Sequence, residues 1–503
     1  MLFNTMQYIL FLPIVVSIYY FLPSKLRNGW LLCVSYYFYM QWNPIYIMLL
    51  FSCTLITYTG GLVLEKLKRL HGESEYNSGK RNRKSKLCLI LCISISLGIL
   101  FFYKYLLFGI SLFNRILECV HMEEISWEYE ILLPVGISFY TLQALSYLID
   151  VYRGDIFAEK SFIRYALFVS FFPQLVAGPI ERSKNLLVQF SIDHTFTYKN
   201  LQKGMLWILY GLFIKMVIAD RAAIIVNTVY ENSSVYSGFY IIVATFFFAI
   251  QIYCDFYGYS TIARGSALLM GYHLMDNFNA PYFSSNVREF WRRWHISLSQ
   301  WFRDYLYIPL GGSKKGVLRK ELNRMLVFAV SGLWHGASLA FVFWGVLNGA
   351  AQVFEDVADK LKEKLKIGAI RRTVCFSKKL LQVFGTFLLV TFAWLFFRSG
   401  EFEVALDVLK SMCHFDNLAG ILDGSLSTKI LGGKIYMNIL LVSILALFIV
   451  DFYKYKGRDV AELFLAQKWW FRTLMIMLMI FTILLFGCYG EIYDIQQFIY
   501  FQF

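Results

Sequence analysis

One histidine stands where an ionisable side chain is costly. His335 interrupts the apolar run 323–351. Basic residues flank this run on both sides, so both of its ends should face the cytoplasm, which favours a hairpin over a single crossing. Thirteen residues from Asn323 to His335 rise about 20 Å, past the midplane of a ~30 Å hydrocarbon core. We therefore expect a helical hairpin over 323–354 with His335 near its tip.

An imidazole at that depth indicates a functional site. Burying an ionisable side chain in the membrane is unfavourable, so such residues are kept mainly where they have a function. A neutral histidine can remove a proton from a hydroxyl that attacks an activated acyl group. Trp334 could line the same cavity, and Gly332 and Gly336 allow a substrate or a helix to approach closely. The alternative is a histidine buried only for packing. The sequence has no GxSxG or HExxH motif and no Cys–His ligand set, so we expect no metal.

A second histidine, His295, lies in the segment 284–312, which helical spacing predicts to be one amphipathic helix at the cytoplasmic interface. The aromatic face of this helix comprises Trp291, Trp294, His295, Leu298, Trp301, Phe302 and Tyr305, and the polar face carries Arg292, Ser299 and Arg303. Two interpretations stay open. The helix could merely anchor the protein, or its aromatic side chains could desolvate His295 and keep it neutral and able to accept a proton.

The elements that must position these histidines are membrane helices. Of 503 residues, 58% are hydrophobic and 16% charged, against about 25% charged in soluble domains. Long apolar stretches predict spans at 6–22, 45–64, 87–110, 380–397, 435–450 and 473–486. We expect the first to be retained, since no cleavage site follows it. The nine cysteines are interpreted as small apolar residues, because they form no CxxC pair.

The charge pattern gives an orientation. The net charge of +14 is explained by basic loops at 65–86, 360–379 and 454–472, which the positive-inside rule places in the cytoplasm, so no nucleic acid partner is expected. The N-terminus, three spans before the first of these loops, and the C-terminus should then both lie outside. Between 152 and 288, polar residues and prolines interrupt the apolar runs, which predicts broken or re-entrant helices around a polar interior. We treat residues 1–503 as one all-α, polytopic membrane domain.

Two long motifs resemble the membrane-bound O-acyltransferase (MBOAT) superfamily, in particular its bacterial branch that includes the membrane subunit of alginate O-acetylation. They are REFWRRWHISLSQWFRDYLYIPLGG around His295 and SGLWHGASLAFVFWGVLNG around His335. Shorter matches are LPVGISFYTLQALSYLIDVYRG from Leu133, FFPQLVAGPIER from Phe171, QIYCDFYGYSTIARG from Gln251 and the terminal FIYFQF. Together these matches cover nearly the whole chain.

The resemblance implies a fold of roughly ten or more membrane helices, with re-entrant and interfacial helices around a central tunnel. It also implies that His335 is the essential catalytic residue and that His295 is the second characteristic histidine. Positional or cavity-lining roles are expected for the residues that match the motif around His295, namely Asn286, Arg293, Trp301, Arg303 and Asp304. Arg303 and Asp304 could equally form a structural ion pair.

By the same resemblance, the function is transfer of an acetyl group from cytoplasmic acetyl-CoA, with no bound cofactor, to a hydroxyl of an exported cell-surface polysaccharide. An extracytoplasmic partner acetyltransferase of the SGNH-hydrolase kind could receive the group first. The expected location is the bacterial cytoplasmic membrane. Three alternatives remain: D-alanyl transfer to teichoic acid from a carrier-protein thioester, a transporter with a polar site at the midplane, and a lipid-modifying acyltransferase. The sequence shows no internal repeat, which disfavours the transporter.

Overall fold

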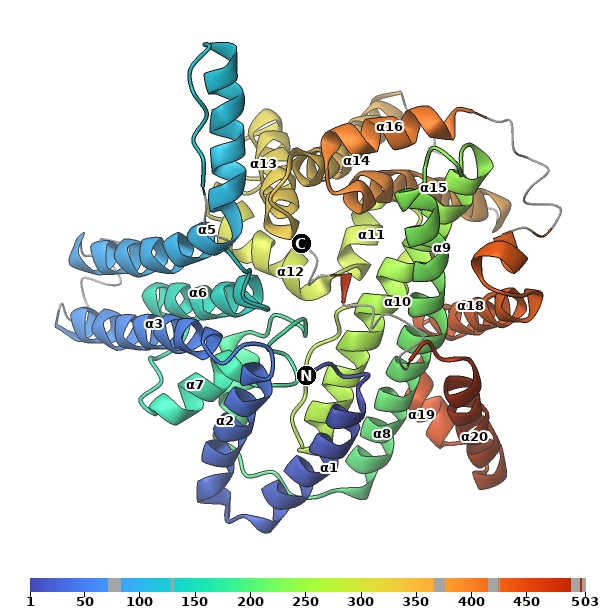
Figure 1. Cartoon of the computed structure of the whole chain (residues 1–503). Helices are drawn as coiled ribbons and strands as arrows, with labels where there is room; N and C mark the ends of the chain where they lie inside the picture. The colour runs from blue at the N-terminus through green and yellow to red at the C-terminus, as the bar shows by residue number, and fades with distance from the viewer. Residues whose placement is uncertain are drawn as a thin grey trace. The chain divides into compact units, whose positions relative to one another are not determined.

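The computed structural model describes residues 1–70, 83–127, 131–365, 376–414, 424, 426–489 and 498–499. The regular structure within these ranges is helical (Figure 1). The described residues group into two compact units, one of Met1–Gly204 with Ala263–Met275 and the other of Met205–Ile262 with Asp276–Phe503. Each unit is described by itself. The last four residues of the terminal FIYFQF motif (500–503) lie outside the described residues, as do 71–82, 128–130 and 366–375, which belong to the predicted acidic and basic loops.

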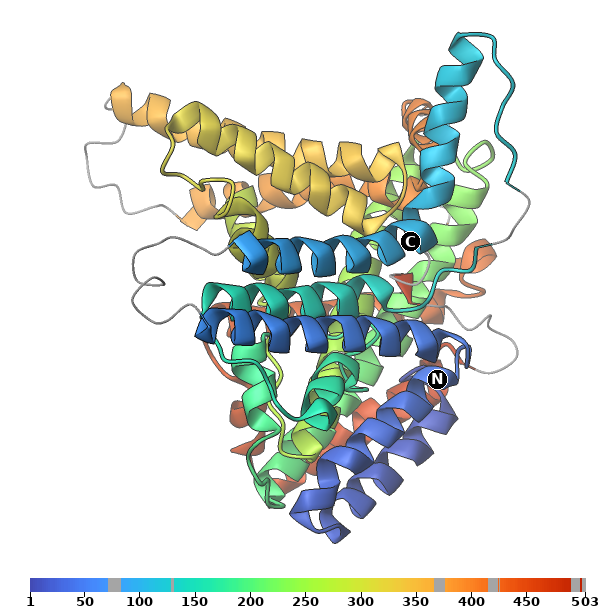
Figure 2. The ribbon, with the colours of Figure 1, turned by 90° about the vertical axis from the view of Figure 1, so that its left-hand side faces the viewer.

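The first unit is built around a layer of long helices, α3, α5 and α6, that lie side by side in Figure 2. Its elements are α1 (Met6–Phe21), α2 (Ser24–Met40), α3 (Tyr46–Arg69), α5 (Arg83–Cys119), α6 (Ile137–Arg153), α7 (Phe162–Ser170) and η1 (Ser183–Leu187). A Cβ on Gly61 of α3 would lie 2.7 Å from the Tyr147 ring of α6, so glycine is needed for this contact. The Tyr165 hydroxyl also lies 2.7 Å from Thr57 Oγ1.

Helices α8 (Tyr198–Phe213) and α10 (Phe239–Leu269) run from one unit into the other. The second unit continues with η2 (Ile214–Ala219), α9 (Asp220–Glu231), η3 (Pro281–Phe283), α11 (Val287–Arg293), α12 (Ile296–Phe302), η4 (Arg303–Tyr307), α13 (Val317–His335) and α14 (Leu339–Lys364). It ends with α15 (Phe376–Ser399), α16 (Phe402–Met412), η5 (Leu426–Ile430), α18 (Lys434–Tyr455), α19 (Val460–Leu465) and α20 (Trp469–Phe486).

Six helices among the described residues are long and apolar enough to cross a membrane: α3, α5, α10, α15, α18 and α20. Five of them coincide with spans predicted from the sequence. The remaining predicted stretch, 6–22, is occupied by the apolar helix α1, which is too short for this group. Helix α10 is not among the predicted spans, because interrupted apolar runs between 152 and 288 prevented a count of the segments there. The helix itself carries polar side chains such as Gln251 and Asp255. Those side chains are buried, as expected for polar groups at membrane depth.

The polar interior predicted between residues 152 and 288 contains a buried group of charged side chains around Lys215. Lys215 Nζ lies 2.7 Å from Asp220 Oδ1 and 2.5 Å from Asp255 Oδ1, and all three side chains are buried. The other oxygen of Asp255 accepts a hydrogen bond of 2.9 Å from the backbone N–H of Ile499. Pairing lowers the cost of burying these charges, and it holds η2, α9 and α10 together with a residue near the end of the chain.

Helices α13 and α14 form the hairpin that carries His335, and they run antiparallel side by side (Figures 1 and 2). A Cβ on Gly332 would lie 2.1 Å from the carbonyl oxygen of Phe341, and one on Gly345 would lie 2.2 Å from the carbonyl oxygen of Phe328. The two backbones can therefore touch only because both positions are glycine. The close approach that Gly332 and Gly336 permit is used by the hairpin itself.

The prediction of one continuous amphipathic helix over 284–312 is wrong. The segment contains two seven-residue helices, α11 and α12, separated at Trp294 and His295. His295 has a φ of 41°, in the left-handed region, which ends one helix and starts the next at an angle. Helical spacing alone missed this break because neither glycine nor proline marks it. Trp291, Trp294, Leu298, Trp301 and Phe302 are all buried in the protein.

Candidate active site

His335 is the last residue of α13 and lies in an aromatic cage. Its exposed fraction is 4%. The imidazole centroid lies 4.8 Å from Trp334, 5.2 Å from Trp344 of α14 and 5.5 Å from Phe397 of α15. The Trp344 and Phe397 rings meet the imidazole edge-on, at interplanar angles of 88° and 69°. These three rings surround the imidazole with apolar surface.

The cage is built in layers of aromatic rings. Trp344 stacks on Trp394 of α15 at 5.4 Å, and Trp394 in turn lies 5.0 Å from Trp294. On the α11 side, Trp291 Nε1 donates to Asn348 Oδ1 at 3.1 Å. Each aromatic pair of this kind contributes about 0.5–1.5 kcal/mol beyond the area that it buries. The cage therefore holds the tip of the hairpin firmly.

His295 caps the start of α12 and is completely buried. Its ring lies 4.6 Å from Phe256 of α10, edge to face. Its Nδ1 lies 3.3 Å from Oδ1 of Asn277. His295 is outside the six candidate spans, and burial lowers its pKa to about 3, so the ring is neutral at pH 7.

The fold brings the two histidines together although 40 residues separate them in the sequence. Their ring centroids are 6.4 Å apart at an interplanar angle of 62°, and Trp334 contacts both, 4.8 Å from His335 and 6.2 Å from His295. Two buried imidazoles at this separation can act on the same small group, one accepting a proton while the other holds a hydroxyl or carbonyl by a hydrogen bond. This arrangement suits acyl transfer to a hydroxyl.

Of the residues expected to line the cavity, Trp334 is beside both histidines, whereas Asn286 and Arg293 stabilise α11. Asn286 is its N-cap and accepts a hydrogen bond of 2.8 Å from the Glu289 N–H. Arg293 pairs with Glu289 at 3.0 Å, donates to the Asn279 carbonyl at 3.1 Å and lies over the Tyr455 ring. Both residues thus have local contacts that account for their side chains.

The remaining three predicted residues lie further along the same segment. Trp301 is buried against Phe302 and Tyr305, with ring centroids 5.5 Å and 5.2 Å away. Arg303, with 60% of its side chain exposed, pairs with its neighbour Asp304 at 2.8 Å. This is the ion pair that the sequence analysis left open as the alternative role for these two residues.

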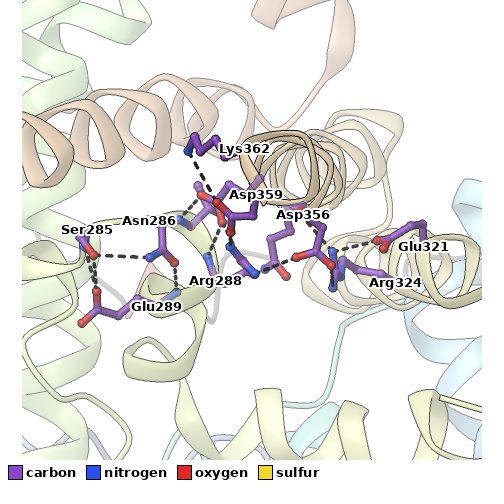
Figure 3. A network of polar contacts seen from close by, with 12 residues as sticks. Ser285, Asn286, Arg288, Glu289, Glu321, Arg324, Asp356, Asp359 and Lys362 are labelled. Carbon is purple, nitrogen blue, oxygen red and sulfur yellow. Dashed lines mark hydrogen bonds and ion pairs between the residues drawn. The ribbon is translucent and has the colours of Figure 1, made fainter. Parts of the chain in front are cut away.

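An ionic cluster ties the α11 segment to the hairpin (Figure 3). Arg288 of α11 donates to Asp356 at 2.8 Å and to Glu355 at 3.2 Å, both on α14. Glu355 also accepts the backbone N–H of Val287 at 2.5 Å, at the start of α11. Arg324 of α13 reaches the other oxygen of Asp356 at 2.9 Å. The cluster therefore fixes the two elements that carry the histidine motifs relative to each other.

Sequence reasoning did not single out Asn277, Trp344, Asn348 or Phe397. Trp344 and Asn348 stand in the matched motif around His335, one and two helical turns into α14, and that regular spacing could have indicated them. Asn277 and Phe397 come from distant parts of the chain. No local pattern marks them, because their roles depend on tertiary contacts.

Comparison with known proteins defines the class. A family model described as the membrane-bound O-acyltransferase family matches residues 155–396. A full-length comparison extends the similarity, since one relative is 37% identical over 81% of this chain and 73% of its own length. The chain belongs to the MBOAT family and is an O-acyltransferase. With its several candidate spans, it is a multi-pass membrane protein.

Three relatives illustrate the range of activities. The probable alginate O-acetylase of Pseudomonas aeruginosa is 37% identical over 406 residues, covering 81% of this chain and 73% of that protein. The peptidoglycan O-acetyltransferase of Helicobacter pylori is 34% identical over 444 residues, covering 82% and 80% of the two chains. The teichoic acid D-alanyltransferase of Bacillus subtilis is 25% identical over 245 residues, covering 46% and 61%.

Proposed function

We propose that this protein transfers an acetyl group from cytoplasmic acetyl-CoA across the bacterial cytoplasmic membrane to a hydroxyl of an exported cell-surface polysaccharide or of a partner acetyltransferase. The observation that carries the proposal is the buried pair His335 and His295, with ring centroids 6.4 Å apart. The similarity to two kinds of O-acetyltransferase supports acetyl as the group transferred.

His335 acts as the general base in this proposal. It takes the proton of the acceptor hydroxyl while the hydroxyl oxygen attacks the thioester carbonyl. The C–S bond then breaks, and the thiolate leaves and takes up a proton. The aromatic cage of Trp334, Trp344 and Phe397 supports this role, because water that entered the site would compete with the hydroxyl and hydrolyse the thioester.

The first test is turnover of radiolabelled acetyl-CoA by the purified protein in liposomes. We expect His335→Ala to lose at least about 100-fold in transfer or hydrolysis, as is typical when a general base is removed. His414→Ala is the matched control, because His414 is exposed and follows α16, outside the cage. Turnover by His335→Ala equal to that of the wild type would exclude His335 as the base.

The second candidate is D-alanyl transfer from a carrier-protein thioester, favoured by the similarity to the teichoic acid enzyme. That relative shares fewer residues over a smaller part of the chain than the O-acetyltransferases do. The same liposomes separate the two donors when they are supplied with acetyl-CoA and with a D-alanyl carrier protein in parallel. Turnover of the carrier thioester alone would replace acetyl transfer with D-alanyl transfer.

A further inference from the structure

The side-chain oxygen of Asn277 has three contacts with the turn that holds His295. This oxygen, Oδ1, accepts hydrogen bonds from the Ser297 hydroxyl at 2.7 Å and from the Ser297 backbone N–H at 3.2 Å. The same oxygen lies 3.3 Å from His295 Nδ1. All three residues are buried, with exposed fractions of 1% or less. Asn277 therefore touches the histidine and the residue two positions after it.

These contacts determine which end of the Asn277 amide faces the histidine. An amide oxygen and nitrogen are distinguished only by their hydrogen-bond partners. A backbone N–H can only donate, so the atom that faces the Ser297 N–H must be the oxygen. His295 Nδ1 faces that same oxygen, which can only accept. Nδ1 must therefore be the donor, and in a neutral ring the lone pair is on Nε2.

Main-chain hydrogen bonds hold Asn277 in place beside the His295 turn. The Ile296 N–H donates to the Asn277 carbonyl at 2.9 Å, and the Asn279 N–H donates to the Arg293 carbonyl at 2.9 Å. These bonds lie on both sides of the left-handed turn at His295. Segment 277–279 is thereby fixed against 293–297, so the amide cannot drift away from the imidazole.

We infer that Asn277 is a positioning residue that holds His295 in the tautomer protonated on Nδ1, so that Nε2 is the atom able to accept a proton or a hydrogen bond from a hydroxyl. The groups that face the His295 ring include the amide of Asn277, the aromatic Phe256 and Trp334 and the titratable His335. The role of Nε2 in catalysis rests on the proposed function, whereas the assignment of the tautomer does not. The tautomer itself is a property of the resting protein.

The tautomer can be observed directly. The chain has seven histidines, so ¹⁵N-histidine labelling of the full-length protein in bilayers gives few ring signals. The signal of His295 is assigned by its loss in His295→Gln. We expect a protonated Nδ1 and an unprotonated Nε2 at pH 7 in the wild type. Asn277→Ala should lose that preference, whereas Asn279→Ala, two residues away, should keep it.

Either of two results would overturn the inference: a wild-type His295 protonated on Nε2, or an unchanged signal in Asn277→Ala. Ser297→Ala provides a second check, because the backbone N–H that orients the amide remains. We expect it to keep the Nδ1–H signal. Since these spectra need no turnover, they remain informative if His335→Ala should disprove the proposed function.

Asn277→Asp tests the catalytic consequence. It keeps the oxygen acceptor and the size of the side chain, but a carboxylate stabilises the imidazolium and raises the pKa of His295. Below that raised pKa, Nε2 carries a proton and cannot accept another. We expect the acidic limb of the pH–rate profile to move up by at least about one pH unit, with turnover recovering at high pH. Wild-type turnover by Asn277→Asp at a pH where its spectra show an imidazolium at His295 would show that Nε2 takes no part in the reaction.

Discussion

At the scale of single residues, the backbone of His295 is as specialised as its ring. A φ of 41° places a non-glycine residue in the left-handed region, which costs about 1–2 kcal/mol. The buried contacts of the ring with Phe256 and Asn277 offset this conformational energy. Strain that is maintained in this way is common at functional sites, where it directs a side chain to its target.

This strain gives a prediction that separates stability from activity. His295→Ala and His295→Gly both remove the ring, so both should lose most transfer activity. Only glycine relieves the backbone strain, so the glycine variant should be about 1 kcal/mol more stable than the alanine variant. Thermal unfolding in detergent, followed by tryptophan fluorescence, measures the difference.

Ser299 provides the control, because it lies within α12 in an ordinary helical conformation. There the order should reverse, with Ser299→Gly less stable than Ser299→Ala by roughly 0.5–1 kcal/mol. If alanine were the more stable substitution at both positions, the left-handed turn at His295 would carry no strain.

At the scale of elements, the sequence predicted the parts better than their junctions. Five spans and the hairpin around His335 follow from runs of apolar residues and from flanking charges, which are local signals. The break at His295 does not, since its left-handed turn is held by Asn277, 18 residues earlier in the chain. For the same reason, both histidines could be predicted as candidates, but not their separation of 6.4 Å.

The ionic cluster of Figure 3 predicts a pH-dependent coupling between α11 and the hairpin. Burial raises the pKa of Asp356, but hydrogen bonds from Lys320 and Arg324 outweigh it and lower the pKa to about 2. The folded pKa is thus below that of the unfolded chain, about 3.9. The stabilisation is therefore fully present above pH ~4 and is lost as the pH falls from about 4 to about 2.

We expect Asp356→Asn to lower the free energy of unfolding at pH 7 by about 1–3 kcal/mol, because three cationic side chains lose a charged acceptor. The deficit relative to the wild type should shrink as the pH falls from about 4 to about 2. Asp407→Asn is the control, since Asp407 pairs with Lys410 on an exposed surface and should change little at any pH. A deficit that is constant down to pH 2 would assign the stabilisation to something other than the charge of Asp356.

At the scale of the whole molecule, the proposed transfer reaction requires a defined orientation in the membrane, because the proposal places the donor and the acceptor on opposite sides. Lys454 in the last turn of α18, with Lys456 and Arg458 just after the helix, lies at one end of a 22-residue candidate span. Positively charged loops are retained in the cytoplasm. The end of α15, near Glu401, should then be outside, since the basic block that precedes this helix is also cytoplasmic by the same rule.

Single reporter cysteines test this orientation. In a background without reactive cysteines, Arg458→Cys and Glu401→Cys each place a thiol at an exposed position. A membrane-impermeant maleimide should label position 401 in intact cells and position 458 only after the membrane is opened. The reverse pattern would place the basic loops outside and the thioester donor on the wrong side of the protein. Labelling of both positions in intact cells would mean that α15 and α18 do not each cross the membrane once. The proposed topology, with the donor in the cytoplasm and the acceptor outside, would then be wrong.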